Sequence, residues 1–132
     1  MTQVWDTAGQ ERYQSLGIAF YKGAECCLLV YDITNAHTFD SLTSWKNEFL
    51  RQAAPKNPDA FPFMVIGNKA DRESERKVPK AKVEQWCKTN GEMPYFEASA
   101  KDQTNVDLVF ETSAKLALKN QGVTMYLLNY II

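Results

Sequence analysis

Residues 63–71, Phe-Met-Val-Ile-Gly-Asn-Lys-Ala-Asp, decide the fold of this chain. The first four are an uninterrupted apolar run, which is typical of a strand covered on both faces of a parallel sheet. A glycine closes the run, and polar residues follow at once. Because ligands of open α/β sheets bind at the carboxyl ends of the strands, we expect Asn68, Lys69 and Asp71 to lie at a binding edge.

Two more strands and a helix are predicted upstream. Residues 1–5 look like the end of a strand, and Cys26–Tyr31 (CCLLVY) is a second continuous apolar run. Apolar residues at helical spacing predict an amphipathic helix from Thr38 to about Ala53, with Thr38 as its N-cap.

The alternation of strand and helix continues downstream. Pro79 suits the first turn of a helix that contains Val83 and Cys87. Pro94–Phe96 predicts a short strand, and residues 106–117 predict a last helix. Strands that alternate with helices in one domain indicate an α/β fold with a mostly parallel sheet, flanking helices and right-handed crossovers.

Composition excludes several classes of protein. The 132 residues can form one domain, and a net charge of −1 without a basic run predicts no nucleic-acid partner. Cys26, Cys27 and Cys87 lack metal-ligand spacing and are expected to be reduced core thiols, while His37 is expected in a turn before a helix. No apolar run is long enough to span a bilayer and no leader is visible, so we expect a cytoplasmic chain.

A polar, glycine-containing loop follows the first strand as Asp6-Thr7-Ala8-Gly9-Gln10-Glu11. An aspartate at a strand end can hold Mg²⁺ directly or through water. A backbone N–H at Gly9 can reach a γ-phosphate, and Gln10 can orient an attacking water. The pattern DxxG is by itself a common turn.

The loops after the later strands suit a purine base. The carboxylate of Asp71 offers two acceptors that match the N1–H and N2–H₂ donors of guanine, and adenine would leave it unpaired. The stem of Lys69 can lie over the purine plane. Backbone N–H groups of residues 97–101 (Glu-Ala-Ser-Ala-Lys) can meet the guanine O6.

Taken together and in this order, the three loops resemble the DxxGQ, NKxD and SAK motifs of Ras-like GTPases. Arg12–Leu16, Phe20–Ala24 and Leu29–Thr34 resemble the segments that set the Rab branch apart. Within that branch, the late-endosomal, vacuolar or lysosomal subclass is resembled by Phe20–Cys27 (FYKGAECC), by the tryptophan, phenylalanine and proline pattern of Trp45–Phe63, and by Pro94–Glu97. The resemblance covers roughly Thr2 to Lys119.

This resemblance implies a P-loop NTPase-like G domain over residues 1–119, followed by an atypical apolar tail, 120–132. It implies GTP or GDP and Mg²⁺ as cofactors, the metal being held through water by Asp6, and Gln10 as the residue that positions the hydrolytic water. Implied partners are Rab effectors, exchange factors and GTPase-activating proteins (GAPs), with effectors contacting Trp5 and Phe20. The implied nucleotide-binding residues are Asp6, Gly9, Asn68, Lys69, Asp71, Ser99, Ala100 and Lys101.

The sequence also departs from the family. It contains no GxxxxGK[ST] phosphate loop, so the G domain is expected to be incomplete, without its first two strands and first helix. We then expect impaired nucleotide binding and an exposed edge on the Cys26–Tyr31 strand, where the family has another strand. No cysteine follows Cys87 for prenylation, so anchoring at the late endosome, lysosome or vacuole is not expected for this form.

Several alternatives stay open. Residues 123–132 (VTMYLLNYII) are apolar, uncharged and β-prone, and they either pack on the domain or are disordered. The chain is a Rab-like GTPase with impaired chemistry, a non-catalytic interaction protein that binds Rab regulators or effectors through the switch-II surface, or a product without function.

Overall fold

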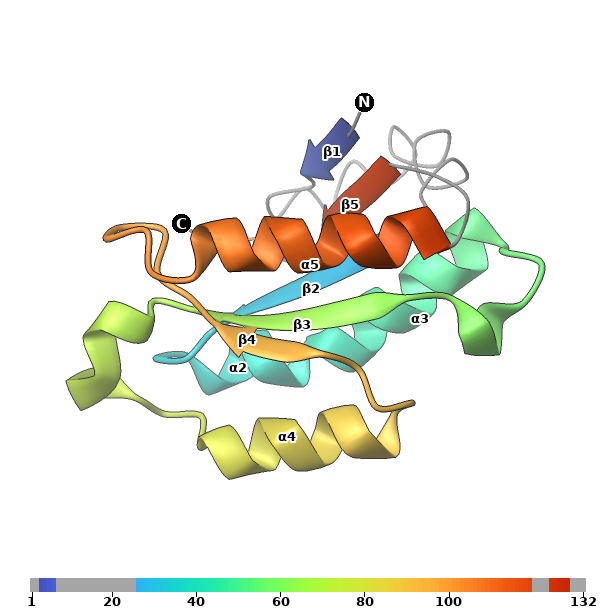
Figure 1. Ribbon diagram of the computed structural model, residues 1–132. Coiled ribbons are helices and arrows are strands. Elements are labelled where there is room, and N and C mark those ends of the chain that lie inside the picture. Colours follow the sequence, from blue (N-terminus) through green and yellow to red (C-terminus); the bar gives the residue numbers. More distant parts are fainter. Residues whose placement is uncertain (1–2, 7–25, 120–123, 129–132) are drawn as a thin grey trace.

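The structure is a computed structural model that describes residues 3–6, 26–119 and 124–128, of which 3–6, 117–119 and 124–128 are described by their backbone alone. Its five strands form one sheet in the order β1-β5-β2-β3-β4, and every neighbouring pair is parallel (Figure 1). The elements in chain order are β1 (Gln3–Asp6), β2 (Cys26–Asp32), α2 (Ala36–Asp40), α3 (Leu42–Ala53), the 3₁₀ helix η2 (Pro58–Ala60), β3 (Phe63–Asn68), the 3₁₀ helix η3 (Ala70–Glu75), α4 (Lys80–Thr89), β4 (Tyr95–Glu97), α5 (Val106–Lys119) and β5 (Thr124–Leu128).

The predicted parallel α/β fold is confirmed, and the two apolar runs form β2 and β3. Every residue of both strands is buried. A strand with helices on both faces has no solvent side, which explains why these runs are continuous and do not alternate with polar residues.

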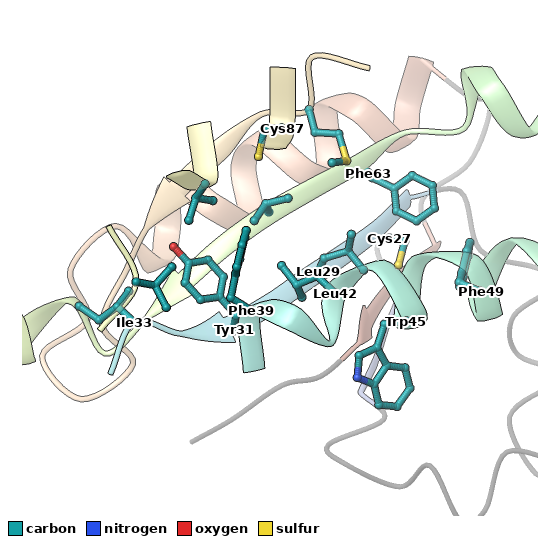
Figure 2. Close-up of a cluster of buried hydrophobic side chains, with 14 of the residues drawn as sticks. Cys27, Leu29, Tyr31, Ile33, Phe39, Leu42, Trp45, Phe49, Phe63 and Cys87 are labelled. Carbon is teal, nitrogen blue, oxygen red and sulfur yellow. The ribbon is translucent and has the colours of Figure 1, made fainter. Parts of the chain in front are cut away.

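Successive residues of β2 divide the core into two layers. Cys27, Leu29 and Tyr31 pack with side chains of α2, α3 and α4 on one face (Figure 2). Cys26, Leu28 and Val30 belong to a second cluster, which includes Val109 of α5 on the other face. This is the period-two alternation of a strand, and α5 covers this second face of the sheet in Figure 1.

An aromatic group closes the first layer at the start of β3. Phe49 of α3 is fully buried, and its ring centroid lies 5.1 Å from Phe61 and 5.8 Å from Phe63. Edge-to-face and tilted contacts at these distances are favourable arrangements of aromatic rings. They join α3 to the segment that leads into β3.

The prediction of one helix capped by Thr38 is wrong. The side chain of Asn35 caps α2 by accepting a hydrogen bond from the backbone N–H of His37 at 3.1 Å, and α3 is a separate helix that starts at Leu42. His37 is therefore helical and does not precede the helix. Thr38 is buried, and its Oγ1 accepts from the backbone N–H of Asp32 at 2.8 Å. The hydrogen bond between the Thr38 hydroxyl and the end of β2 therefore ties α2 to the sheet.

The expectation that the Cys26–Tyr31 strand has an exposed edge is also wrong. β5 pairs with it in parallel, with Cys26 opposite Met125 and Leu29 opposite Leu128. The β-prone, apolar composition of the last residues is what a strand inside a parallel sheet requires. In the described ranges, no helix has the length and apolar character needed to cross a bilayer.

We predict that Phe49→Ala lowers the free energy of unfolding by about 3–5 kcal/mol, because it removes a fully buried ring and leaves a cavity beside Phe61 and Phe63. Urea denaturation monitored by far-UV circular dichroism measures the change. Leu108→Ala on α5 is the matched control, because Leu108 is 43% exposed and its truncation should stay within about 0.5 kcal/mol of the wild type. Equal losses for the two variants would contradict the assigned core.

Candidate functional site

The loops after β3 and β4 leave the same edge of the sheet. In the parallel register Gly67 of β3 lies opposite Glu97 of β4, so the loops that follow these strands leave the sheet side by side. After β3, Lys69 adopts a left-handed conformation with a φ of 66°, which turns the chain into η3. After β4, residues 98–101 turn toward that loop.

Backbone hydrogen bonds hold the two loops together. The N–H of Ala98 donates to the carbonyl of Gly67 at 2.8 Å, and the N–H of Ala70 donates to the carbonyl of Ala98 at 3.0 Å. The β3–β4 ladder thus continues for one step beyond the strands. These bonds anchor both loops to the sheet, and a ligand site on anchored loops can be placed precisely.

The side chains predicted to meet a purine base lie together. Ser99 Oγ donates to Asp71 Oδ1 at 2.6 Å, and the backbone N–H of Ala100 approaches Asn68 Oδ1 at 3.4 Å. The predicted grouping of Asn68, Asp71 and Ala100 at one rim of the sheet is confirmed. That this grouping recognises a base stays a prediction.

These loops enclose an open pocket of about 650 Å³. Asp71 is exposed at its wall, whereas Ser99 is completely buried behind the wall. The hydroxyl of Ser99 therefore positions Asp71. The pocket is lined by Asn68, Lys69, Asp71, Arg72, Ala100 and Lys101.

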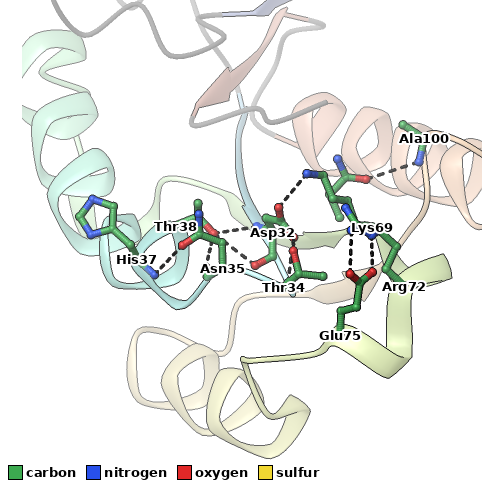
Figure 3. Close-up of polar contacts among 10 residues, drawn as sticks. Asp32, Thr34, Asn35, His37, Thr38, Lys69, Arg72, Glu75 and Ala100 are labelled. Atoms are coloured by element: carbon green, nitrogen blue, oxygen red, sulfur yellow. Dashed lines mark hydrogen bonds and ion pairs between the residues drawn. The ribbon is translucent and has the colours of Figure 1, made fainter.

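Asp32, at the end of β2, is a site residue that the sequence analysis missed. The residue is 4% exposed, and its carboxylate accepts from Lys69 Nζ at 2.9 Å and from the N–H and Oγ1 of Thr34 at 2.8 and 2.6 Å (Figure 3). Burial acts to raise the pKa of Asp32, but the hydrogen bonds from Lys69 and Thr34 outweigh it, so the pKa lies below its ordinary value. The ion pair fixes the ammonium of Lys69 at the rim of the pocket.

The sequence contained a signal for Asp32. It directly follows an apolar strand run, much as Asn68 comes one glycine after the next run, and it is the neighbour of Asn68 in the β2–β3 register. A search for polar residues at the end of every predicted strand would have found it.

A second charged group braces the two loops from the outside. Arg76, which follows η3, makes two hydrogen bonds to the carboxylate of Glu97, and Tyr95 donates to the same carboxylate. Burial acts to raise the pKa of Glu97, but the bonds from Arg76 and Tyr95 lower it overall. Paired hydrogen bonds between a guanidinium and a carboxylate fix the relative orientation of the groups.

The side chains predicted to contact phosphate, metal and effectors are not among those that the structure describes. Gly9, Gln10 and Phe20 lie outside the described residues, and Trp5 and Asp6 are described only as backbone at the end of β1. Among the side chains that the structure describes, no three His, Cys, Asp or Glu residues group closely enough to hold a metal ion. The roles of the predicted phosphate, metal and effector residues therefore stay predictions.

The pocket offers a planar ligand a definite set of partners. The exposed carboxylate of Asp71 is an acceptor, the backbone N–H of exposed Ala100 is a donor, and the aliphatic stem of Lys69 is an apolar surface. Such a set fits a flat heterocycle that has two donors along one edge and an acceptor next to them.

Sequence comparison identifies the family of the chain. Residues 1–119 match the Ras family, so the chain belongs to that family of small GTPases. Within the family the chain is Rab7-like. It is 59% identical over 119 residues to the Ras-related protein Rab-7a of Paramecium octaurelia, an alignment that covers 90% of this chain and 58% of that protein.

Relatives from other kingdoms give the same result. Identity is 59% over 119 residues to the Ypt/Rab-type GTPase ypt7 of Schizosaccharomyces pombe, covering 89% of this chain and 58% of the relative. It is 57% over 121 residues to the Ras-related protein RABG3a of Arabidopsis thaliana, covering 90% and 59%. The chain thus spans less than two thirds of the length of these relatives.

We predict that Asp32→Asn lowers the free energy of unfolding by about 1–3 kcal/mol near neutral pH, because it removes the charged acceptor of Lys69 and Thr34. The folded pKa of Asp32 is depressed, so its contribution is complete above the unfolded value of about 3.9 and is lost as the pH falls toward the folded pKa. Urea denaturation at a series of pH values measures this.

The control for this experiment is Asp40→Asn, at an exposed aspartate on α2. Its stability should follow the wild type throughout. An Asp32→Asn variant that loses the same stability at every pH would show that the effect is steric and not due to the carboxylate charge.

Proposed function

We propose that this chain supplies the guanine-recognising part of a Rab-type GTPase. The observation that supports the proposal best is the grouping of the Asp71 carboxylate, the Ala100 N–H and the Asn68 amide around one pocket at the carboxyl ends of β3 and β4. In open α/β sheets this is the edge where ligands bind.

The same groups account for selectivity between purines. Asp71 accepts from the two donors on the guanine edge, and the Ala100 N–H donates to O6. Adenine has an amino group where guanine has O6 and lacks the donor pair, so the carboxylate would remain unpaired. Each unmatched group costs on the order of 1–3 kcal/mol of binding free energy. Ser99 holds the acceptor in place through its 2.6 Å hydrogen bond.

Lys69 covers the face of the base in this proposal. Its ammonium is bound to Asp32 and its side chain is 23% exposed, so the aliphatic stem is the part that a ring would contact. Asp32 is thus a positioning residue for Lys69, acting from the end of the neighbouring strand.

We assign phosphate and metal binding to the end of β1 and to the residues that follow it in the sequence. Asp6 would hold Mg²⁺ through water, Gly9 would donate a backbone N–H to the γ-phosphate, and Gln10 would orient the hydrolytic water. Bound Mg²⁺ would offset the charge of the phosphates. The 132 residues contain no GxxxxGK[ST] motif, and charge-assisted hydrogen bonds contribute about 1.5–3 kcal/mol each, so we expect this chain to bind GTP and GDP weakly.

Similarity to Rab7 and Ypt7 proteins supports a role in traffic to the late endosome, lysosome or vacuole. Trp5 and Phe20 are the proposed contacts for effectors, and exchange factors and GAPs are the proposed regulators. Trp5 stands in β1, next to the proposed metal residue Asp6.

We predict that GDP perturbs the amide resonances of Ala100 and Lys101 at lower concentration than ADP does, and that Asp71→Ala removes this difference. The reason is that Asp71 alone offers the two acceptors for the guanine edge. Titration of ¹⁵N-labelled chain with each nucleotide in the presence of Mg²⁺, followed by two-dimensional NMR, measures both effects and remains informative for weak binding.

Asp59→Ala serves as the control, because Asp59 is an exposed carboxylate in η2, far along β3 from the pocket. This variant should keep the preference for GDP. Equal perturbation by GDP and ADP in the wild type would sink the guanine assignment. Submicromolar binding of GDP would instead show that the expected weakness at the phosphates is wrong.

A further inference from the structure

β1 is attached to the sheet through β5. In the part of the chain that the structure describes, β5 is the sole partner strand of β1, with Gln3 opposite Thr124 and Asp6 opposite Leu127. The order β1-β5-β2 leaves no direct ladder between β1 and β2. Backbone pairing thus joins the first described strand to the last.

The other edge of β5 pairs with β2. Residues 26–29 of β2 lie opposite residues 125–128, again in parallel. The same residues of β2 are fully buried with β5 in place, and backbone donors and acceptors left unpaired along this edge would cost free energy. Because β5 lies between β1 and β2, it supplies backbone partners to both of these strands and removes this cost for each.

We propose that β1 and β2 form a strand slot, bounded by Gln3–Asp6 and Cys26–Leu29, which binds an extended apolar segment in parallel register. In this chain the occupant is the chain's own segment Thr124–Leu128. Its sequence, TMYLL, is uncharged, contains no proline or glycine and favours β structure, as a strand with partners on both edges requires. Main-chain hydrogen bonds supply the binding, as in other cases of strand addition.

The slot has a consequence for the candidate site. Asp6 is the last residue of β1, and its register partner Leu127 is also the register partner of Leu28 in β2. The C-terminal segment therefore sets where β1 ends relative to the other strand ends. This inference concerns the backbone of the sheet and does not depend on guanine binding.

A cross-linking experiment on the full chain tests the register. Met125→Cys places a thiol opposite the native Cys26, and neighbouring strands lie about 4.8 Å apart, within the Cα separation of about 4.4–6.8 Å that a disulfide allows. Mild oxidation and peptide mass spectrometry should identify a disulfide within one chain between Cys26 and the thiol introduced at position 125. Leu128→Cys is the matched control, because its register partner, Leu29, is not a cysteine.

Hydrogen exchange gives a second test that does not need a cross-link. Amides of Met125–Leu128 should be protected in the wild-type chain. Leu127→Pro should speed exchange by about tenfold or more in both Val4–Asp6 and Cys26–Leu29, because proline cannot donate to the ladder. Ile131→Pro, placed beyond the bounds of β5, should leave these rates unchanged.

The outcomes are decisive in both directions. Protected β5 amides with an intrachain link support the slot. Unprotected amides at Met125–Leu128 in the wild type overturn it, whatever the proline variant does. A link that forms only between chains, seen as a dimer on a non-reducing gel, overturns the assignment of the chain's own segment as the occupant.

Discussion

A parallel strand buried on both faces must also find a partner at each edge, and β2 is where this chain meets that constraint. Its seven residues are all buried, and its alternating side chains build both layers of the core. β3 satisfies one edge and β5 the other. The helices on either face, the two core layers and the strand ends that form the pocket all take their positions from this strand.

The pocket follows from the same arrangement. Two neighbouring polar residues come from strand ends, Asp32 from β2 and Asn68 from β3, and Asp71 of η3, held by Ser99, stands close to Asn68. Hydrogen bonds beyond the ladder keep the β3 and β4 loops in contact, and the Arg76–Glu97 pair braces them outside the pocket. These polar contacts hold the loops together, although the loops contain few apolar residues.

Local sequence patterns predicted much of the fold and of the pocket, but they missed the contacts between residues that are distant in the sequence. Apolar runs identified β2 and β3, and strand-end polarity identified Asn68 and Asp71, because both signals are contained in short windows. The cap at Asn35 was missed because Thr38 has the right chemistry for a cap but is engaged by the backbone of Asp32. The ion pair of Asp32 with Lys69 joins the ends of two different strands that lie far apart in the sequence, beyond any local pattern.

The pairing of β1 with β5 also bears on when the sheet can form. These strands lie at opposite ends of the chain, with Gln3 opposite Thr124, so they are among the most non-local contacts available to it. Contacts of this kind close slowly, because a long loop must be ordered before they form. During synthesis on the ribosome, the β2–β3–β4 part can assemble first, while β1 has to wait until the C-terminal segment has left the exit tunnel.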